Sequence, residues 1–331
     1  MSSAYRPISI LPALSKFWEH TLKILIERSI GRDPFHKDQF GFRRRRGTLE
    51  ALNRTVAVAE NCRRRGLVCV LVALDVKDAF NTLRVECILQ EAQRRRLPGR
   101  VQELIGDYLA DRKIIAHCRD DVVGRNVCAG VPQGSVLGPL LWNLMYDGIL
   151  ETFDREKDIE AVAFADNLAV LLKARESLGI EDRIRAVIST AIRWCSDVGL
   201  HLAREKTEII LLTRKRIPTS FNFDARDAGK ISTIKTVKYL GVLLDNARGF
   251  SPHLESSCDK AERFLGAIRG LLPNVNGPTD TVRRLYYGVW ESVVLYGAPI
   301  WASSLVKVNN REIIKRAQRA AMIRTSTAYR M

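Results

Sequence analysis

Two aspartates stand where the chain could bring carboxylates together. Asp75 directly follows an apolar run of eight residues, and Asp166 lies with Asn167 between two short apolar segments. The eight-residue run is β-branched and too short for a typical helix, which predicts a strand buried on both faces. The two-residue spacing of the later segments predicts a β-hairpin with Asp166 and Asn167 at its tip. If these strands are neighbours in one sheet, the two carboxylates meet at one edge.

A carboxylate pair of this kind suits a hard divalent cation. Mg²⁺ takes oxygen ligands and is commonly held by one or two carboxylates together with substrate phosphates. Two such ions about 3.5–4 Å apart can activate a hydroxyl nucleophile and stabilise the leaving oxygen of a phosphoryl displacement. The alternative is that Asp75 and Asp166 only end strands, where aspartate is a common turn former.

The elements that must position these side chains follow from the apolar periodicity. Helices are expected over 11–30, 48–65, 84–96, 99–111, 181–198, 254–272, 280–295 and 310–324, with a further helix after the turn at 132–135. Strands are expected over 67–74, 160–165, 168–172, 206–212 and 237–244, and a hairpin over 113–128. A boundary is expected at 250–252, because only helical patterns follow it.

Length and composition bound the class of protein. The 331 residues are 46% apolar, so the chain can bury a sizeable core. An excess of 53 Lys and Arg over 37 Asp and Glu gives a formal charge of +16, which favours a polyanionic partner, although a merely soluble basic protein is the alternative. The seven cysteines contain no C-x-x-C pair and the five histidines are scattered, so neither a disulfide framework nor a zinc site is expected. The longest apolar run is far short of the ~20 residues of a membrane helix, and we expect an intracellular protein with no membrane partner.

Seven short strings occur along the chain in an order typical of one family. They are YRPIS from residue 5, DQFGFR from 38, LDVKDAF from 74, PQGS from 132, FADN from 164, GL and KTE within 199–208, and KYLGV from 238. Together they resemble the reverse transcriptases of non-LTR retrotransposons, over essentially the whole chain. The resemblance implies an α+β right-hand polymerase: fingers over 1–66, an antiparallel-sheet palm over 67–247 with interleaved fingers helices at about 84–128, and a helical thumb with the start of a connection segment over 248–331.

The resemblance implies a catalytic centre for RNA-directed DNA synthesis. Asp75, the backbone carbonyl of Val76 and Asp166 would bind Mg²⁺, as two ions, with Mn²⁺ as a substitute. Lys206 matches the lysine proposed as general acid to the leaving pyrophosphate, although a strand-end lysine is more often simply solvated. The implied partners are an RNA template, a DNA primer and deoxynucleoside triphosphates.

A nucleotide site is implied beside that centre. Its residues would be Arg6 and the amides of Asp78 and Ala79 for the triphosphate, Phe80 under the sugar, and Gln133 and Gly134 in a nucleotide-binding turn. A ring at Phe80 would clash with a ribose 2′-hydroxyl and admit deoxyribose; the alternative is a core aromatic. Arginine runs at 43–46, 63–65 and 94–96, with Lys315, Arg316, Arg319 and Arg324, are expected to face template and primer.

One departure from the family bears on activity. The hairpin normally ends in two aspartates, and here the second position is Asn167. Loss of one negative charge predicts severely reduced or absent polymerase activity, since even substitutions outside the ligand set typically lower metal affinity or activity ~10–100-fold. The alternatives are a catalytically dead nucleic-acid-binding remnant and, less favoured by the charge, a structural or interaction protein with no affinity for nucleic acid.

The resemblance also bears on the chain's context. Its matches begin at residue 5 and run to the end, so we expect a truncated fragment of an element's polyprotein whose endonuclease part is missing. Nuclear residence is implied, because such elements copy themselves at chromosomal targets. Host, element clade, insertion target, expression and oligomeric state do not follow from the sequence.

Overall fold

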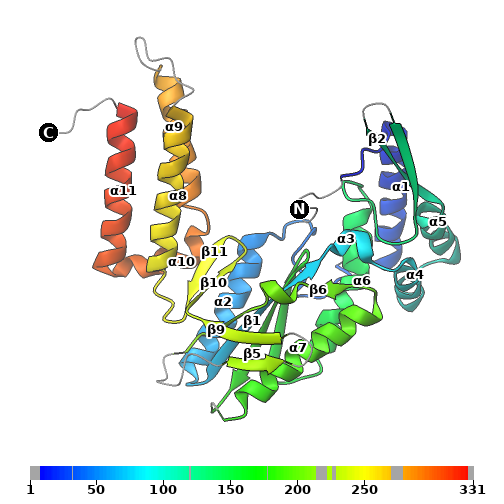
Figure 1. The fold of residues 1–331 in the computed structure, drawn as a ribbon, viewed down its shortest axis with the longest axis horizontal. Helices are drawn as coiled ribbons and strands as arrows, with labels where there is room; N and C mark the ends of the chain where they lie inside the picture. The colour runs from blue at the N-terminus through cyan, green and yellow to red at the C-terminus, as the bar shows by residue number, and fades with distance from the viewer. Residues whose placement is uncertain are drawn as a thin grey trace.

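A twisted central sheet with helices on both faces carries the molecule (Figure 1). The computed structural model describes residues 8–31, 33–118, 121–176, 178–213, 222–225, 229–269 and 279–326. The sheet has the strand order β4-β5-β1-β7-β9-β8, with β6 paired to one end of β1. Its strands are β1 (Val68–Lys77), β4 (Ile159–Phe164), β5 (Asn167–Ala174), β6 (His201–Leu202), β7 (Glu208–Leu211), β8 (Asn222–Ala225) and β9 (Gly229–Ile234). All pairs are antiparallel except β7 with β9.

Strand β1 is buried on both faces, as its unbroken apolar run predicts. Val70 and Val72 point into the core on one face of the sheet, whereas Cys69 and Leu71 point into the core on the other. This two-residue alternation is the pleat of the strand. Because β1 lies between β5 and β7, its end carries Asp75 into the middle of the sheet edge rather than to a solvent-facing rim.

Each face of the sheet has its own cover. One core is completed by α4 (Val85–Arg94), α5 (Gly99–Leu109), α6 (Gly138–Phe153) and α7 (Ile180–Asp197). The other is completed by α2 (Thr48–Arg64), the hairpin of β10 (Thr236–Tyr239) with β11 (Val242–Asp245), and α10 (Ala298–Trp301). Helix α6 is largely apolar and is buried on nearly all sides, including at Asn143 and Asp147, which fits its place under the sheet.

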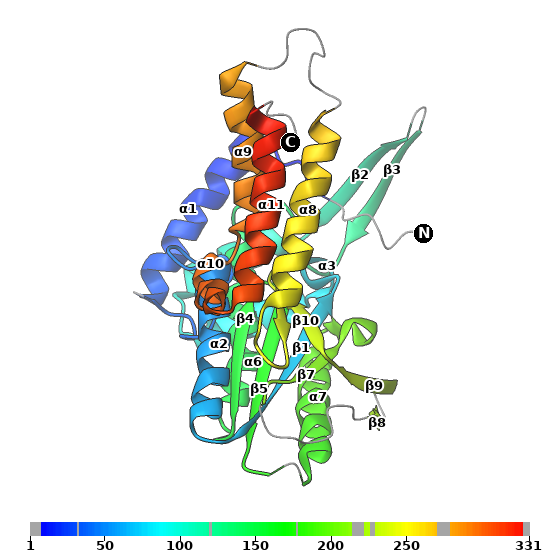
Figure 2. The same ribbon diagram turned by 90° about the vertical axis from the view of Figure 1, so that its left-hand side faces the viewer.

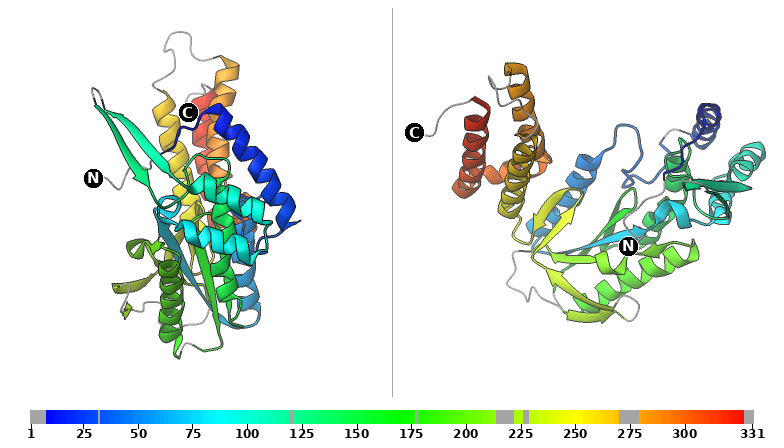
Figure 3. Two further views of the ribbon diagram at one scale, coloured as in Figure 1. Left: turned by 90° about the vertical axis from the view of Figure 1, so that its right-hand side faces the viewer. Right: turned by 45° about the horizontal axis from the view of Figure 1, so that its top comes forward.

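Two further groups of elements stand on opposite sides of the sheet (Figures 1 and 3). On one side lie α1 (Ala13–Ile30) and the hairpin of β2 (Arg112–Cys118) with β3 (Asp121–Val127), next to α4 and α5. On the other side α8 (Ser251–Arg269), α9 (Asp280–Val294) and α11 (Val308–Ser326) form a bundle that rises above the sheet (Figure 2). That bundle has a separate small core around Leu265, Trp290 and Val294. The arrangement is the right-hand polymerase fold, which confirms the predicted fold class.

Three local predictions are corrected by the structure. The segment 237–244 is two strands rather than one, because the chain turns at Leu240 and Gly241, both with positive φ. Lys206 lies in a 3-10 turn, η2 (Arg204–Lys206), and β7 begins only at Glu208. At the hairpin tip, the turn residues are Ala165 and Asp166, and Asn167 is already the first residue of β5. The remaining short elements are α3 (Ala79–Thr82) and η3 (Ala302–Val306), and no helix among the described ranges is long and apolar enough to cross a membrane.

Candidate active site

The sheet brings the two predicted aspartates together. In the antiparallel ladder of β1 with β5, Asp75 lies directly opposite Asn167, so their Cβ atoms are about 4.5–5.5 Å apart on one face. Asp166 precedes Asn167, and its carbonyl accepts a hydrogen bond from the amide of Val76 at 3.3 Å. Residues 91 positions apart in the sequence thus meet at the end of β1.

The neutral side chain at this tip interacts with its acidic neighbour. The Nδ2 group of Asn167 donates to Oδ1 of Asp166 at 3.3 Å. The amide therefore occupies one carboxylate oxygen that an aspartate at the same position would leave for a cation. Sequence reasoning singled out this position, and the structure shows in addition that the amide nitrogen, not the oxygen, faces Asp166.

Lys206 approaches the same carboxylates from the turn before β7. Its Nζ donates to Oδ2 of Asp75 at 2.9 Å, with the Asp75 side chain 22% exposed and the lysine 61% exposed. The turn is held in place because the amide of Ala203 donates to the carbonyl of Asp75 at 2.8 Å. The sequence predicts Lys206 on a strand, but it lies in the 3-10 turn, from which its long side chain reaches the carboxylate of Asp75.

An aromatic layer underlies the carboxylates. Phe80 stacks on Trp142 with 5.4 Å between ring centroids, and Trp142 stacks on Tyr146 at 4.7 Å. Tyr146 is fully buried, and burial raises the pKa of its hydroxyl well above the usual range, with further contributions from Cys195 and from the negative charges of Asp166 and Asp75. Sequence reasoning missed Trp142 and Tyr146. Their four-residue spacing on a largely apolar helix was the available signal, although it is equally typical of a plain core.

The nucleotide-site candidates gather around the short helix α3. Asp78, with a left-handed φ of +49°, caps α3, and Ala79 is its first residue. The carbonyl of Phe80 accepts from the amide of Val131 at 2.6 Å, which ties α3 to the segment leading into the 132–135 turn. Phe80 itself is half-buried, and its ring forms a T-shaped pair with Phe42 at 5.7 Å between centroids.

The turn predicted to bind nucleotide is built around a glycine. Gly134 has a φ of +97°, and a Cβ there would lie 3.2 Å from the carbonyl oxygen of Ser9. The carbonyl of Gln133 accepts from the amide of Ser9 at 2.8 Å, so the start of the described chain lies along this turn. Arg6 lies outside the described residues.

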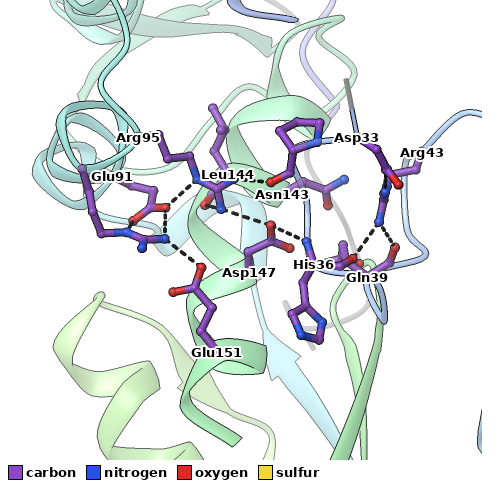
Figure 4. A network of polar contacts seen from close by, with 12 residues as sticks. Asp33, His36, Gln39, Arg43, Glu91, Arg95, Asn143, Leu144, Asp147 and Glu151 are labelled. Atoms are coloured by element: carbon purple, nitrogen blue, oxygen red, sulfur yellow. Dashed lines mark hydrogen bonds and ion pairs between the residues drawn. The ribbon is translucent and has the colours of Figure 1, made fainter. Parts of the chain in front are cut away.

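One arginine in each of two runs, Arg43 and Arg95, is engaged inside the fold, whereas Arg44, Arg45, Arg94 and Arg96 are exposed. The Arg95 guanidinium binds Asp147 at 3.0 Å and Glu91 at 2.6 Å, while Arg43 donates to the carbonyl of His36 at 2.7 Å and contacts Asp33 (Figure 4). Both arginine side chains are largely buried. Arg43 and Arg95 are therefore not available to template and primer, because carboxylates and carbonyls of the chain already engage them; for the other arginines of these runs the expectation stays a prediction.

The exposed run at 63–65 lies far from the carboxylates. It ends α2, just before β1 begins, and seven strand residues separate the start of β1 from Asp75, about 23 Å at 3.3 Å per residue. On α11, Lys315, Arg316 and Arg319 are exposed, and the side chain of Arg324 lies outside the described part.

The donors at the site fit a hard divalent cation. Asp75, Asp166 and the amide of Asn167 supply oxygens at one edge, and the backbone carbonyl of Val76 is adjacent. Among the residues that the structure describes, no group of three or more His, Cys, Asp or Glu side chains converges. Two carboxylates suit one ion that keeps several waters, and they are a weak set for a second ion.

Comparisons with known proteins agree with this geometry. A family profile described as "Reverse transcriptase (RNA-dependent DNA polymerase)" matches residues 2–244. The "Probable RNA-directed DNA polymerase from transposon BS" of Drosophila melanogaster is 28% identical over 320 residues, which cover 93% of this chain and 35% of that protein. The "RNA-directed DNA polymerase from mobile element jockey" of the same species is 28% identical over 76% of this chain and 28% of its own length. The chain thus spans about a third of the length of these curated relatives.

A solved structure supports the fold. The telomerase of Candida tropicalis, in its apo form, superposes with a TM-score of 0.50 at 10% identity, over 95% of this chain and 55% of that one. This likeness bears on the fold alone, whereas the family profile covers both predicted aspartates and the nucleotide turn. The chain belongs to the reverse transcriptase family.

Proposed function

We propose that this chain is the RNA-directed DNA polymerase part of a retrotransposon protein, with activity impaired by Asn167. The observation that carries the proposal is the ladder register that sets Asp75 opposite Asn167 and next to Asp166. Two carboxylates at one sheet edge, over a half-buried ring at Phe80, form a site for a nucleotide and a divalent cation.

Each residue of the site receives a role in this proposal. Asp75, the carbonyl of Val76 and Asp166 would hold Mg²⁺ or Mn²⁺, up to two ions, with the second held weakly because Asn167 is neutral. When bound, the cation supplies charge stabilisation for the transferring phosphoryl group. We assign Lys206, whose Nζ lies 2.9 Å from Oδ2 of Asp75, the role of general acid to a leaving pyrophosphate.

The nucleotide would lie over α3 and the 132–135 turn. The amides of Asp78 and Ala79 would meet its phosphates, with Arg6 as a further phosphate contact, and Gln133 and Gly134 would line the base side. We assign the ring of Phe80 to the sugar, since it is half-buried and is held by its stack on Trp142. A ring fixed at that level excludes a 2′-hydroxyl by contact.

The partners proposed are an RNA template, a DNA primer and deoxynucleoside triphosphates. The formal charge of +16 favours polyanions. We propose the same division of the chain: fingers over 1–66, palm over 67–247 with the fingers helices α4 and α5 and the β2–β3 hairpin interleaved, and thumb with the start of a connection segment over 248–331. We also propose that the chain acts in the nucleus as part of a longer protein that supplies an endonuclease.

Primer extension tests the proposal. The purified chain and its Asn167→Asp variant are compared on an RNA template with a DNA primer and Mg²⁺, and Asp75→Asn in the Asn167→Asp background serves as the inactive control. We expect extension by Asn167→Asp to exceed that of the parent by about 10–100-fold. No extension by Asn167→Asp, at any Mg²⁺ or Mn²⁺ concentration, would refute the assignment.

A catalytically inactive nucleic-acid-binding remnant is the second candidate. The hydrogen bond from Asn167 to Asp166 and the ion pair of Lys206 with Asp75 favour it, because both occupy oxygens that a cation needs. Filter binding of an RNA–DNA duplex against salt concentration should give a steep slope for either candidate. Incorporation of nucleotide by the parent chain separates them, and binding without salt dependence would favour an interaction protein instead.

A further inference from the structure

One buried indole touches both halves of the proposed site. Trp142 lies on α6 with no exposed surface, and its Nε1 donates to the carbonyl oxygen of Ala165 at 3.1 Å. Ala165 immediately precedes Asp166 in the hairpin turn. It adopts a left-handed φ of +55°, a conformation that is unfavourable for a residue with a Cβ and that persists only when its surroundings hold it.

The ring faces of the same indole support Phe80. The Phe80 and Trp142 rings are stacked with an interplanar angle of 21°, and Trp142 in turn stacks on Tyr146. The ring of Trp142 thus supports the Phe80 ring by stacking. Its N–H holds the turn that bears Asp166 through the hydrogen bond to Ala165.

A second contact confines the turn from another direction. Gly41 packs so closely that a Cβ there would lie 2.1 Å from the amide nitrogen of Ala165. Asn143, the neighbour of Trp142 on α6, donates its Nδ2 to the carbonyl of Gly41 at 2.8 Å. The turn that bears Asp166 is therefore held between α6 and the Gly41 loop.

We propose that Trp142 is a positioning residue that couples the sugar-contacting ring of Phe80 to the metal-binding turn at Asp166. The inference rests on the proposed function, since it gives Asp166 a cation and Phe80 a sugar to contact. Trp142 itself would touch neither the nucleotide nor the cation. Loss of its N–H takes the donor from the half-buried carbonyl of Ala165 and removes one of the contacts that fix the turn, and displacements of about 1 Å at a reacting centre can lower rates ~10²-fold.

The test replaces the indole by a ring that keeps the stack. In the Asn167→Asp background, Trp142→Phe removes the N–H and retains an aromatic face. Trp194→Phe is the matched control, because Trp194 also packs edge-on against Tyr146 at 5.8 Å but contacts neither Phe80 nor the turn in any ring pair or hydrogen bond that the described residues show. Circular dichroism and urea unfolding confirm that both variants are folded.

Manganese binding followed by electron paramagnetic resonance is the readout that does not depend on activity. We expect Trp142→Phe to weaken Mn²⁺ binding about tenfold and Trp194→Phe to leave it unchanged. In primer extension, Trp142→Phe should raise the Mg²⁺ concentration for half-maximal rate and increase ribonucleotide incorporation relative to deoxynucleotide severalfold. A purely structural role would alter the unfolding midpoint and neither of these.

The outcomes separate this inference from the proposed function. Mn²⁺ binding and sugar selectivity that are equal in Trp142→Phe and Trp194→Phe would overturn the positioning role alone. An Asn167→Asp parent that binds no Mn²⁺ would overturn both. If Trp142→Phe does not fold, Gly41→Ala, which displaces the same turn from the other side, should weaken Mn²⁺ binding, and unchanged binding in that variant would overturn the positioning role.

Discussion

The Asn167→Asp substitution has consequences that can be worked out from the ladder register. In the metal-free protein a new carboxylate would face Asp75 at a Cβ separation of about 5 Å. Two unit charges at that distance repel by about 3 kcal/mol at an effective dielectric constant of ~20. Solvent access and salt reduce this to about 1–2 kcal/mol. For a protein of 331 residues the unfolding midpoint should therefore fall by about 1–3 °C without divalent cation.

Magnesium should reverse the order of stability. A ligand at 100 times its dissociation constant stabilises the folded state by about 2.7 kcal/mol. If Asn167 weakens binding by ~10–100-fold, the same concentration stabilises the parent by only about 0.4–1.4 kcal/mol. Asn167→Asp should thus be less stable than the parent in chelator and at least as stable in saturating Mg²⁺.

The assay is thermal unfolding over a Mg²⁺ titration, run beside primer extension. Asn61→Asp is the charge-matched control, because Asn61 is exposed near the end of α2, at the opposite end of β1 from the site. It should show no Mg²⁺-dependent gain. A Mg²⁺ response of Asn167→Asp equal to that of the parent, with equal extension rates, would refute the reasoning that a missing charge at residue 167 limits this site.

Three further outcomes follow from individual contacts. Lys206→Met removes the cation that competes at the first carboxylate, so Mn²⁺ titration should show binding tightened about two- to fivefold while primer extension by the Asn167→Asp form slows. Gly41→Ala forces a Cβ into the hairpin tip and should lower the free energy of unfolding in urea by about 1–3 kcal/mol, whereas Gly106→Ala, in open space on α5, should raise it by about 0.5–1 kcal/mol. Arg95→Ala leaves Asp147 buried without its guanidinium and should reduce that free energy by about 3–5 kcal/mol at neutral pH.

The last of these losses should depend on pH with a defined sign. Burial raises the pKa of Asp147, against hydrogen bonds from the His36 amide and Arg95 that lower it. Removal of Arg95 raises the folded-state pKa further, so the folded protein binds the proton more tightly than the unfolded chain. The lost stability should be recovered as pH falls through the folded-state pKa, with recovery complete below the unfolded value of about 3.9. A loss of stability that is constant with pH would show that Asp147 is not its source. The Arg95→Lys variant tests whether a positive charge alone, without the guanidinium geometry, restores the stability.

Weaker or unchanged Mn²⁺ binding in Lys206→Met would contradict the competition that the 2.9 Å contact implies. For the glycine pair, equal effects of the two substitutions would show that propensity rather than close approach controls residue 41.

The local pattern of the sequence was sufficient for most of the helices, for β1 and for the β4–β5 hairpin, but it did not give β8 and β9 or the division of 237–244 into two strands. In an unbroken apolar strand, side chains on both faces need to be buried. Strand β1 therefore lies between two hydrophobic cores, and Asp75 comes near its end, at the edge of the sheet. The hairpin that bears Asp166 follows from its two-residue turn, although the turn residues were displaced by one position. The family followed from ordered short strings, which are themselves local.

Pairing between distant segments was decided only by the tertiary structure. The register of Asp75 with Asn167, the contact of Lys206 with Asp75, and the N–H of Trp142 on the hairpin turn all join segments that no periodicity relates. Similar arginine runs also differ in their environment for this reason. Arg95 binds a buried carboxylate from a distant segment, whereas the arginines at 63–65 remain exposed. A charge run reports how many cations the chain has, and burial against a partner decides which of them are left for a nucleic acid.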